Sequence, residues 1–172
     1  MSYTLDVGCG SGQNQQFMHI KHRGNINTDI LKPIKPIPDF VQCDAQHLPF
    51  KDKTFTRSLF IDVLEHVDNP AQSLKELKRV TENEVVVGTP NAMYFKKVLR
   101  SYIKGDYIPY LEHITTWGTP ELENLCKHAG FKNVQIKGSD YRVKEKPIYR
   151  FLRMFFPQKM RKRQLIASLT VT

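Results

Sequence analysis

Short apolar runs recur along the chain, and most of them end in an acid or a glycine turn. They predict buried strands at residues 4–7, 25–28, 40–43, 56–61, 85–87, 134–137 and 166–171. A brief helix is expected at 13–21, and two segments with clear helical spacing lie at 70–80 and 120–129. Strands that alternate with helices are typical of a parallel α/β sheet. The last two strands have no clear helix between them, which leaves an antiparallel pairing open.

The two helices carry boundary signals of their own. Asn69 is expected to cap the first helix, with Pro70 at its first position. Thr119 is expected to cap the second, and Gly130 is expected to end it. The aromatic-rich stretch 91–117 has no regular pattern and is interpreted as a lid over the site where a substrate binds.

Length and composition predict one soluble domain over residues 1–172, with 40% hydrophobic residues to fill a core. No apolar run approaches the ~20 residues of a membrane-spanning helix, and the first residues do not resemble a signal peptide. Three widely spaced cysteines favour reduced thiols, and hence a cytoplasmic protein. His19 and His22 have no third partner in evidence, so no metal site is expected.

Positive charge is concentrated near the carboxyl terminus. Residues 144–164 hold eight basic residues and one acid, which is +7 of the net charge of +9. Aromatic residues alternate with these charges. The segment fits a solvated surface helix, a contact with anionic lipid headgroups at the membrane periphery, or a contact with nucleic acid phosphates. The sequence leaves the three interpretations open.

A glycine turn, G-x-G-x-G, follows the first strand at Gly8, Gly10 and Gly12. It is not the dinucleotide fingerprint, because Gln13 stands where that motif has its third glycine, and it is not a Walker loop. Asp29, 17 residues after the turn, ends the second strand and can accept hydrogen bonds from ribose hydroxyls. A ligand of open α/β sheets binds beyond these strand ends.

Several segments resemble one known family. Residues 5–12 (LDVGCGSG) are similar to motif I of the class I S-adenosylmethionine-dependent methyltransferases. Residues 43–55 (CDAQHLPFKDKTF) and 62–67 (DVLEHV) resemble the following motifs of the type-11 methyltransferases, as do 113–117 and 129–131. The resemblance implies a three-layer, Rossmann-like, mostly parallel seven-stranded sheet with an antiparallel last strand. Only three residues precede the first strand, so a compact variant without the N-terminal helix is expected.

The resemblance also implies a pocket for S-adenosylmethionine. Gly8, Cys9 and Gly10 would approach its methionine and ribose portion, Asp6 would lie near its amino group, and Asp29 would hold the ribose. Asp44 and Ala45 would bind the adenine, and Asp62 would lie beside the methionine moiety and the sulfonium. Ile30 and Val63 complete the expected set. A proline-rich loop at 31–38 replaces the family's next helix and is expected to leave the adenine side open.

Methyl transfer by direct displacement needs alignment above all, and it needs a general base only for a protonated acceptor. The base candidates are His113 and His66, ahead of Asp62 and Glu65. The leading hypothesis is an enzyme that methylates a small-molecule or lipid-linked acceptor. The alternatives are an RNA or protein methyltransferase that uses the basic segment, and an S-adenosylmethionine-binding protein without catalysis.

Overall fold

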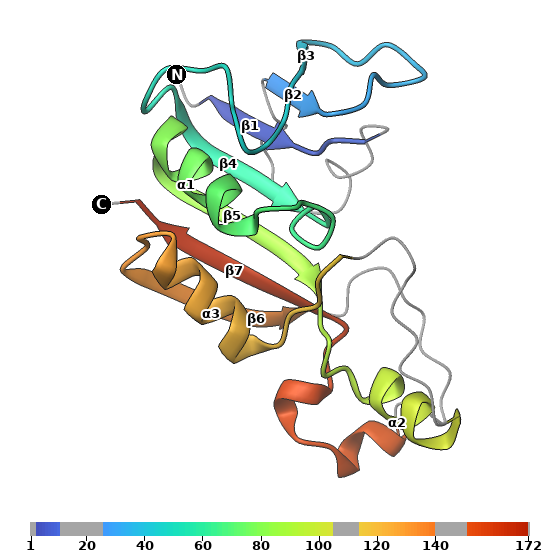
Figure 1. Cartoon of the computed structure of the whole chain (residues 1–172). Coiled ribbons are helices and arrows are strands. Elements are labelled where there is room, and N and C mark those ends of the chain that lie inside the picture. The colour runs from blue at the N-terminus through green and yellow to red at the C-terminus, as the bar shows by residue number, and fades with distance from the viewer. Residues whose placement is uncertain (1–2, 11–25, 105–113, 140–150, 172) are drawn as a thin grey trace.

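The protein is described by a computed structural model at residues 3–10, 26–104, 114–139 and 151–171. Seven strands form one twisted sheet in the order β3-β2-β1-β4-β5-β7-β6 (Figure 1). The strands are β1 (Thr4–Val7), β2 (Ile26–Asp29), β3 (Phe40–Gln42), β4 (Phe55–Ile61), β5 (Thr81–Pro90), β6 (Asn133–Ser139) and β7 (Gln164–Thr170). Among the described strands, β7 runs antiparallel to both of its neighbours, β5 and β6, and the remaining pairs of neighbouring strands are parallel. The Rossmann-like seven-stranded sheet with an antiparallel last strand is confirmed.

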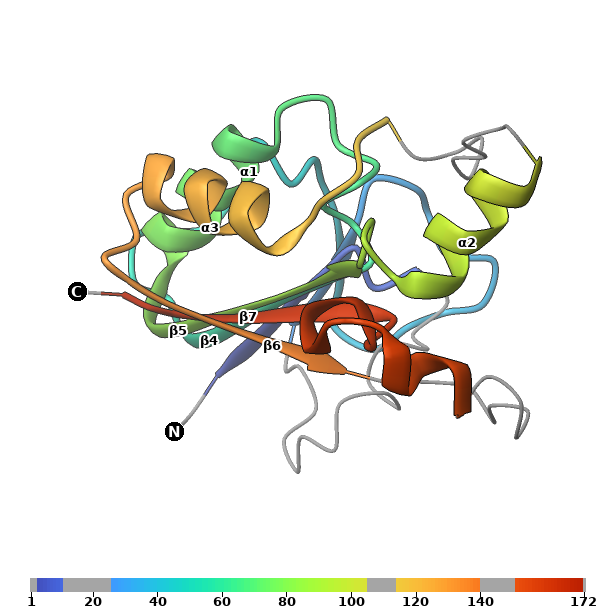
Figure 2. The same ribbon diagram turned by 90° about the horizontal axis from the view of Figure 1, so that it is seen from below.

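Two helices, α1 (Pro70–Val80) and α3 (Thr119–His128), pack side by side on one face of the sheet (Figure 2). The opposite face buries Leu59, Ile61 and Val86. The helix expected at 13–21 lies outside the described residues. None of the described helices has the length and apolar character needed to cross a membrane.

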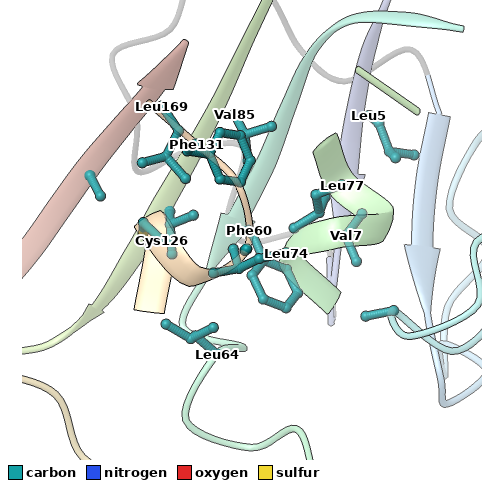
Figure 3. Packing of buried hydrophobic residues seen from close by; sticks show 14 of the residues in the cluster. Leu5, Val7, Phe60, Leu64, Leu74, Leu77, Val85, Cys126, Phe131 and Leu169 are labelled. Atoms are coloured by element: carbon teal, nitrogen blue, oxygen red, sulfur yellow. The ribbon is translucent and has the colours of Figure 1, made fainter. Parts of the chain in front are cut away.

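The main core lies between these two helices and the sheet. One buried cluster contains Phe60 from β4, Val85 from β5, Leu74 and Leu77 of α1, and Phe131, which follows α3 (Figure 3). All five side chains are at most 2% exposed. Apolar burial on this scale, at ~25 cal/mol per Å², is the main force that holds the strand ends in place.

Three of the four predicted boundary residues, Asn69, Pro70 and Gly130, lie where the sequence placed them. The Asn69 side chain accepts a hydrogen bond from the Gln72 backbone N–H at 3.1 Å, as an N-cap does. Gly130 follows α3 with a φ of +94°, which favours glycine. Thr119 was expected to cap α3, and this is wrong by one residue. The N-cap is Gly118, which has no side chain to contribute, and Thr119 already has helical geometry.

Two elements differ from the predicted pattern. β5 extends over ten residues rather than three, because its polar start pairs with β4 and Arg57 forms an ion pair with Glu84 at 2.6 Å. The expected irregular stretch 91–117 contains a helix, α2 (Phe95–Lys104). It has no acid in its first turn, and Tyr94, the residue before it, is not one of the usual capping residues, so the usual boundary signals are missing. The 3-10 turns η2 (Arg153–Phe155) and η3 (Gln158–Met160) lie beside it (Figure 2).

Candidate functional site

A cleft of about 1210 Å³ opens at the carboxyl ends of β1, β2 and β4. The glycine turn after β1 lines one side, and the turn that begins at Asp62 lines another. The segment 29–37 after β2 forms the outer wall, and Asp44 and Ala45 after β3 complete the lining. Parallel strands bring these turns together, because all of them leave the sheet at the same edge.

The glycine turn is fixed by the backbone of β2. The N–H groups of Gly8 and Cys9 both donate to the Thr28 carbonyl oxygen, at 2.8 and 2.9 Å. Gly8 has a φ of +73°, and a Cβ at this position would collide with the Val63 side chain. Gly10 also has a positive φ, of +55°, but faces open space. Glycine is therefore needed at residue 8 for two reasons, conformation and contact, and at residue 10 for one.

Asp29 is held in the cleft by two backbone donors. One carboxylate oxygen accepts from the Gly10 N–H at 2.9 Å, and the other accepts from the Leu31 N–H at 2.9 Å. This contact ties the end of β2 to the glycine turn. Each carboxylate oxygen can accept a further hydrogen bond, so the group stays available to donors of a ligand in the cleft.

Asp6 lies in β1, two residues before Gly8 of the cleft lining. Its side chain is fully buried, and neither carboxyl oxygen has a hydrogen-bond partner among the described residues. Burial, with a smaller contribution from the negative charge of Asp29, raises the pKa of Asp6 to about 7. A buried carboxyl without a donor is costly, and a cationic ligand group nearby would relieve that cost.

Cys9 is also buried, between Gly8 and Gly10 of the cleft lining. Burial raises the pKa of its thiol to about 12, and the charges of Asp6 and Asp29 act in the same direction. A thiol with that pKa stays neutral at pH 7, so it does not act as a nucleophile there. At this position the turn presents backbone groups to a ligand, and no reactive side chain.

The residues that the sequence assigns to the adenine follow the end of β3. Asp44 accepts from the Gln46 N–H at 2.8 Å, and its second oxygen lies 3.9 Å from the His47 imidazole. Ala45 is buried at the cleft wall. The outer wall contains exposed apolar residues of the proline-rich loop, with Leu31 73% and Ile34 fully exposed. The sequence predicted an open side here, but not that this loop lines the cleft.

Asp62 begins the turn after β4 with a φ of +56°. Its N–H donates to the Gly88 carbonyl at 2.9 Å, which holds the start of this turn to β5. The Gln164 side chain donates to one Asp62 oxygen at 2.7 Å. Sequence reasoning missed Gln164, because the two residues are 102 positions apart and only the antiparallel β7 brings them together.

The base candidates differ in their surroundings. His66 is exposed and lines the cleft. Glu65 is buried, accepts from the Thr89 hydroxyl at 3.2 Å, and has its pKa raised to about 7, mainly by burial. Its backbone carbonyl accepts from the Ile114 N–H at 2.9 Å. His113 lies outside the described residues.

The structure brings most of the expected ligand-binding residues to one place. Eight of the ten line the cleft, and the other two, Asp6 and Cys9, are buried residues that adjoin lining residues in the chain. The eight are Gly8, Gly10, Asp29, Ile30, Asp44, Ala45, Asp62 and Val63. Within the described residues no three His, Cys, Asp or Glu side chains gather as a metal site would require.

Comparison with known proteins agrees with this geometry. Residues 5–87 match a family model described as a methyltransferase domain. This match covers 83 of the 172 residues and agrees with the resemblance to the class I, type-11 methyltransferases.

Curated relatives share between a quarter and a third of the aligned residues with this chain. An uncharacterised protein of Methanocaldococcus jannaschii is 33% identical over 108 residues, which is 58% of this chain and 46% of the relative. A second one from that organism is 26% identical over 144 residues, 76% of this chain and 65% of the relative. The chain thus matches about half to two thirds of the length of these curated relatives.

Solved structures share the fold. A SAM-dependent methyltransferase of Thermotoga maritima has a TM-score of 0.70 and 18% identity, with 100% of this chain and 83% of that chain covered. Magnesium protoporphyrin IX methyltransferase of Synechocystis, solved with bound SAH, has a TM-score of 0.60 and 11% identity, with 99% and 74% covered. At these identities the likeness shows the fold of the chain.

Proposed function

We propose that the cleft binds S-adenosylmethionine and that the protein transfers its methyl group to a small-molecule or lipid-linked acceptor. The observation that carries the proposal is the convergence of three features at one cleft. A glycine turn at Gly8 leaves room for a close ligand, Asp29 is fixed beside it, and Asp6, two residues before Gly8, is a buried carboxyl without a donor. These features fit a ligand with ribose hydroxyls and positive charge.

The chain offers a group for each part of this cofactor. Asp29 would accept from the ribose hydroxyls, and Asp6 would compensate the ammonium group directly or through water. Asp44 would accept from the adenine amino group, with the apolar wall at Ile30 and Leu31 beside the ring. Asp62, held by Gln164, would lie near the sulfonium.

Bound S-adenosylmethionine supplies a methyl group already activated for nucleophilic attack. The protein's part is then to orient the reactants, which can contribute ~7–11 kcal/mol. A hydroxyl acceptor also needs a base, and His66 is the candidate among the described residues because it reaches the cleft. Glu65 lies behind it and is too buried to meet an acceptor directly.

Calorimetric titration with S-adenosylmethionine tests cofactor binding. Asp29→Ala should weaken binding at least ~10-fold, since it removes charged hydrogen bonds to the ribose. Asp52→Ala is the matched control, because Asp52 is an exposed carboxylate outside the cleft lining. Equal affinity in both variants would contradict the assignment of Asp29.

Radiolabelled methyl transfer to fractions of a cell extract separates the acceptor classes. Label in the organic phase or in small molecules supports the proposal, whereas label on RNA or protein would support the alternative that uses the basic segment. Binding without label in any fraction would favour a cofactor-binding protein without catalysis. His66→Ala should lower the rate and leave cofactor affinity unchanged if the acceptor is a hydroxyl.

A further inference from the structure

Two segments distant in sequence meet beyond the carboxyl end of β5, and we name them together the basic module, residues 95–104 and 151–163. Figure 2 shows α2 next to the segment with η2 and η3. The rings of Phe95 and Phe156 lie 5.1 Å apart. The side-chain amide of Asn91 donates to the carbonyls of Lys159 and Lys162, each at 2.9 Å. These contacts make the module one surface.

The net charge of the whole chain equals the charge of the basic module. The module holds nine of the 26 Lys and Arg residues and none of the 17 Asp and Glu residues. The other 149 residues hold 26 − 9 = 17 basic and 17 acidic residues, so their formal charge sums to zero. A module that carries only positive charge fits a partner with an extended, negatively charged surface.

Large apolar side chains are exposed on the same module. Tyr102 and Ile103 of α2 are 87% and 72% exposed. Phe151, Met154 and Phe155 are 54–71% exposed. Apolar side chains among basic ones are typical of surfaces that lie in a membrane interface, where apolar groups enter the acyl boundary and the cations meet the headgroups.

We propose that the basic module docks the protein on a bilayer that contains anionic lipids. Aliphatic Ile103 and Met154 favour a lipid surface over a nucleic acid, because single strands are bound mainly by stacking on aromatic rings. The charge of the module has to come from exposed side chains, and Arg100, Lys159 and Arg163 are exposed. Arg161, in contrast, donates to the Phe156 and Met154 carbonyls and supports the module itself.

Docking would place the cleft near the bilayer. Arg163 ends the module, and the next residue, Gln164, donates to Asp62 in the cleft lining. The start of β7 therefore connects the docking surface to the cleft. Docking itself does not depend on the proposed methyl transfer, and it is tested without cofactor.

The test is co-sedimentation of the full chain with vesicles of phosphatidylcholine that contain phosphatidylglycerol, against vesicles of phosphatidylcholine alone. We expect binding to the anionic vesicles only, and its loss at 1 M salt, where charges are screened beyond ~3 Å. The variant Arg100→Glu/Lys159→Glu/Arg163→Glu should lose at least ~10-fold in affinity. The control Lys51→Glu/Lys75→Glu/Lys132→Glu makes the same change in net charge at exposed lysines outside the module and should bind far better.

A second pair of variants tests the apolar contribution. Ile103→Ser/Phe155→Ser should weaken vesicle binding more than Leu31→Ser/Ile34→Ser, which changes side chains outside the module that are at least as exposed. Equal losses in the two charge variants, or no binding to anionic vesicles by the wild type, would overturn the proposal. Tighter binding to RNA, with the vesicles displaced by it, would overturn it in favour of a nucleic acid partner.

Discussion

Asp6 shows how a single side chain links the stability of this protein to pH. Its pKa is about 7 in the folded protein, against an ordinary 3.8, because burial disfavours the charged form. Between about pH 4 and pH 7 the unfolded chain loses this proton while the folded protein keeps it. The free energy of unfolding therefore falls as the pH rises through this window, and it levels off above pH 7. Glu65, with a pKa of about 7, acts in the same direction.

The first prediction concerns this pH dependence. Asp6→Asn removes the titrating group, so the drop in stability between pH 5 and pH 8 should shrink by more than about 1.4 kcal/mol, the equivalent of one pKa unit. Urea unfolding at the two pH values measures it. The buried amide has its own cost, but that cost does not change with pH. The same drop in wild type and variant would show that Asp6 is ionised in the folded protein.

The glycine turn gives a second prediction at the residue scale. Gly8→Ala and Gly10→Ala both place alanine at a positive φ, which costs roughly 1–2 kcal/mol. Only residue 8 also meets Val63, so Gly8→Ala should cost at least about 1 kcal/mol more than Gly10→Ala. Urea unfolding compares them. Val63→Ala added to Gly8→Ala should recover part of the contact cost. Equal destabilisation by the two single changes would mean that Val63 moves aside freely.

At the scale of elements, Asn91 is the residue that joins the end of β5 to the basic module. It is 1% exposed, its amide donates to the Lys159 and Lys162 carbonyls, and its oxygen accepts from the Met93 N–H at 2.9 Å. The Asn91 backbone N–H also donates to the Arg163 carbonyl at 2.8 Å. The segment 151–163 is therefore expected to open locally when this residue loses its two donors.

The third prediction follows from this contact. Asn91→Asp keeps the acceptor for Met93 but turns a carboxylate toward two carbonyls, so cleavage by trypsin after Lys159 and the neighbouring basic residues should accelerate about tenfold or more. The matched control is Asn69→Asp, which keeps a capping oxygen at the start of α1. Cleavage at the same rate in both variants would show that other contacts hold the module.

The elements that the sequence predicted are those whose signals are local. A buried strand with a terminal acid, or a helix with Asn69 and Pro70 at its start, is set by residues next to each other. Helix α2 was missed because it lacks such signals, and the Gln164–Asp62 contact was missed because it depends on the pairing of β5 with β7. The positions of Asp29 and Asp62 at the cleft could be predicted, since parallel strands end at one edge. The buried, unpartnered state of Asp6 required the packing around it.

At the scale of the whole molecule, the cleft lies between turns that the sheet holds at a fixed spacing. A ligand that contacts the turns after β1, β2 and β4 together should stabilise the fold as a unit. At 100 times its Kd a ligand adds about 2.7 kcal/mol to the free energy of unfolding. For a chain of this size that corresponds to a rise in Tm of roughly 5–10 °C.

The fourth prediction is that S-adenosylmethionine and S-adenosylhomocysteine both raise the Tm by this amount, measured by calorimetric or fluorescence melting. Adenosine alone should give a smaller rise, because it lacks the ammonium group that Asp6 would compensate. Asp29→Ala should reduce the shift, and Asp52→Ala should not. A similar shift with all three ligands would indicate that the methionine end makes no contact at the glycine turn.

The distribution of charge also determines how the molecule approaches a surface. Because the 149 residues outside the basic module sum to zero, the positive end acts at a distance as one pole of a permanent electric moment. A negatively charged bilayer exerts a torque on such a body and turns that end forward before any atoms touch. The protein is then already oriented when it reaches the bilayer, and a larger share of the collisions bring the basic module to the lipid surface. Added salt should accordingly slow the association rate much more than it changes the dissociation rate.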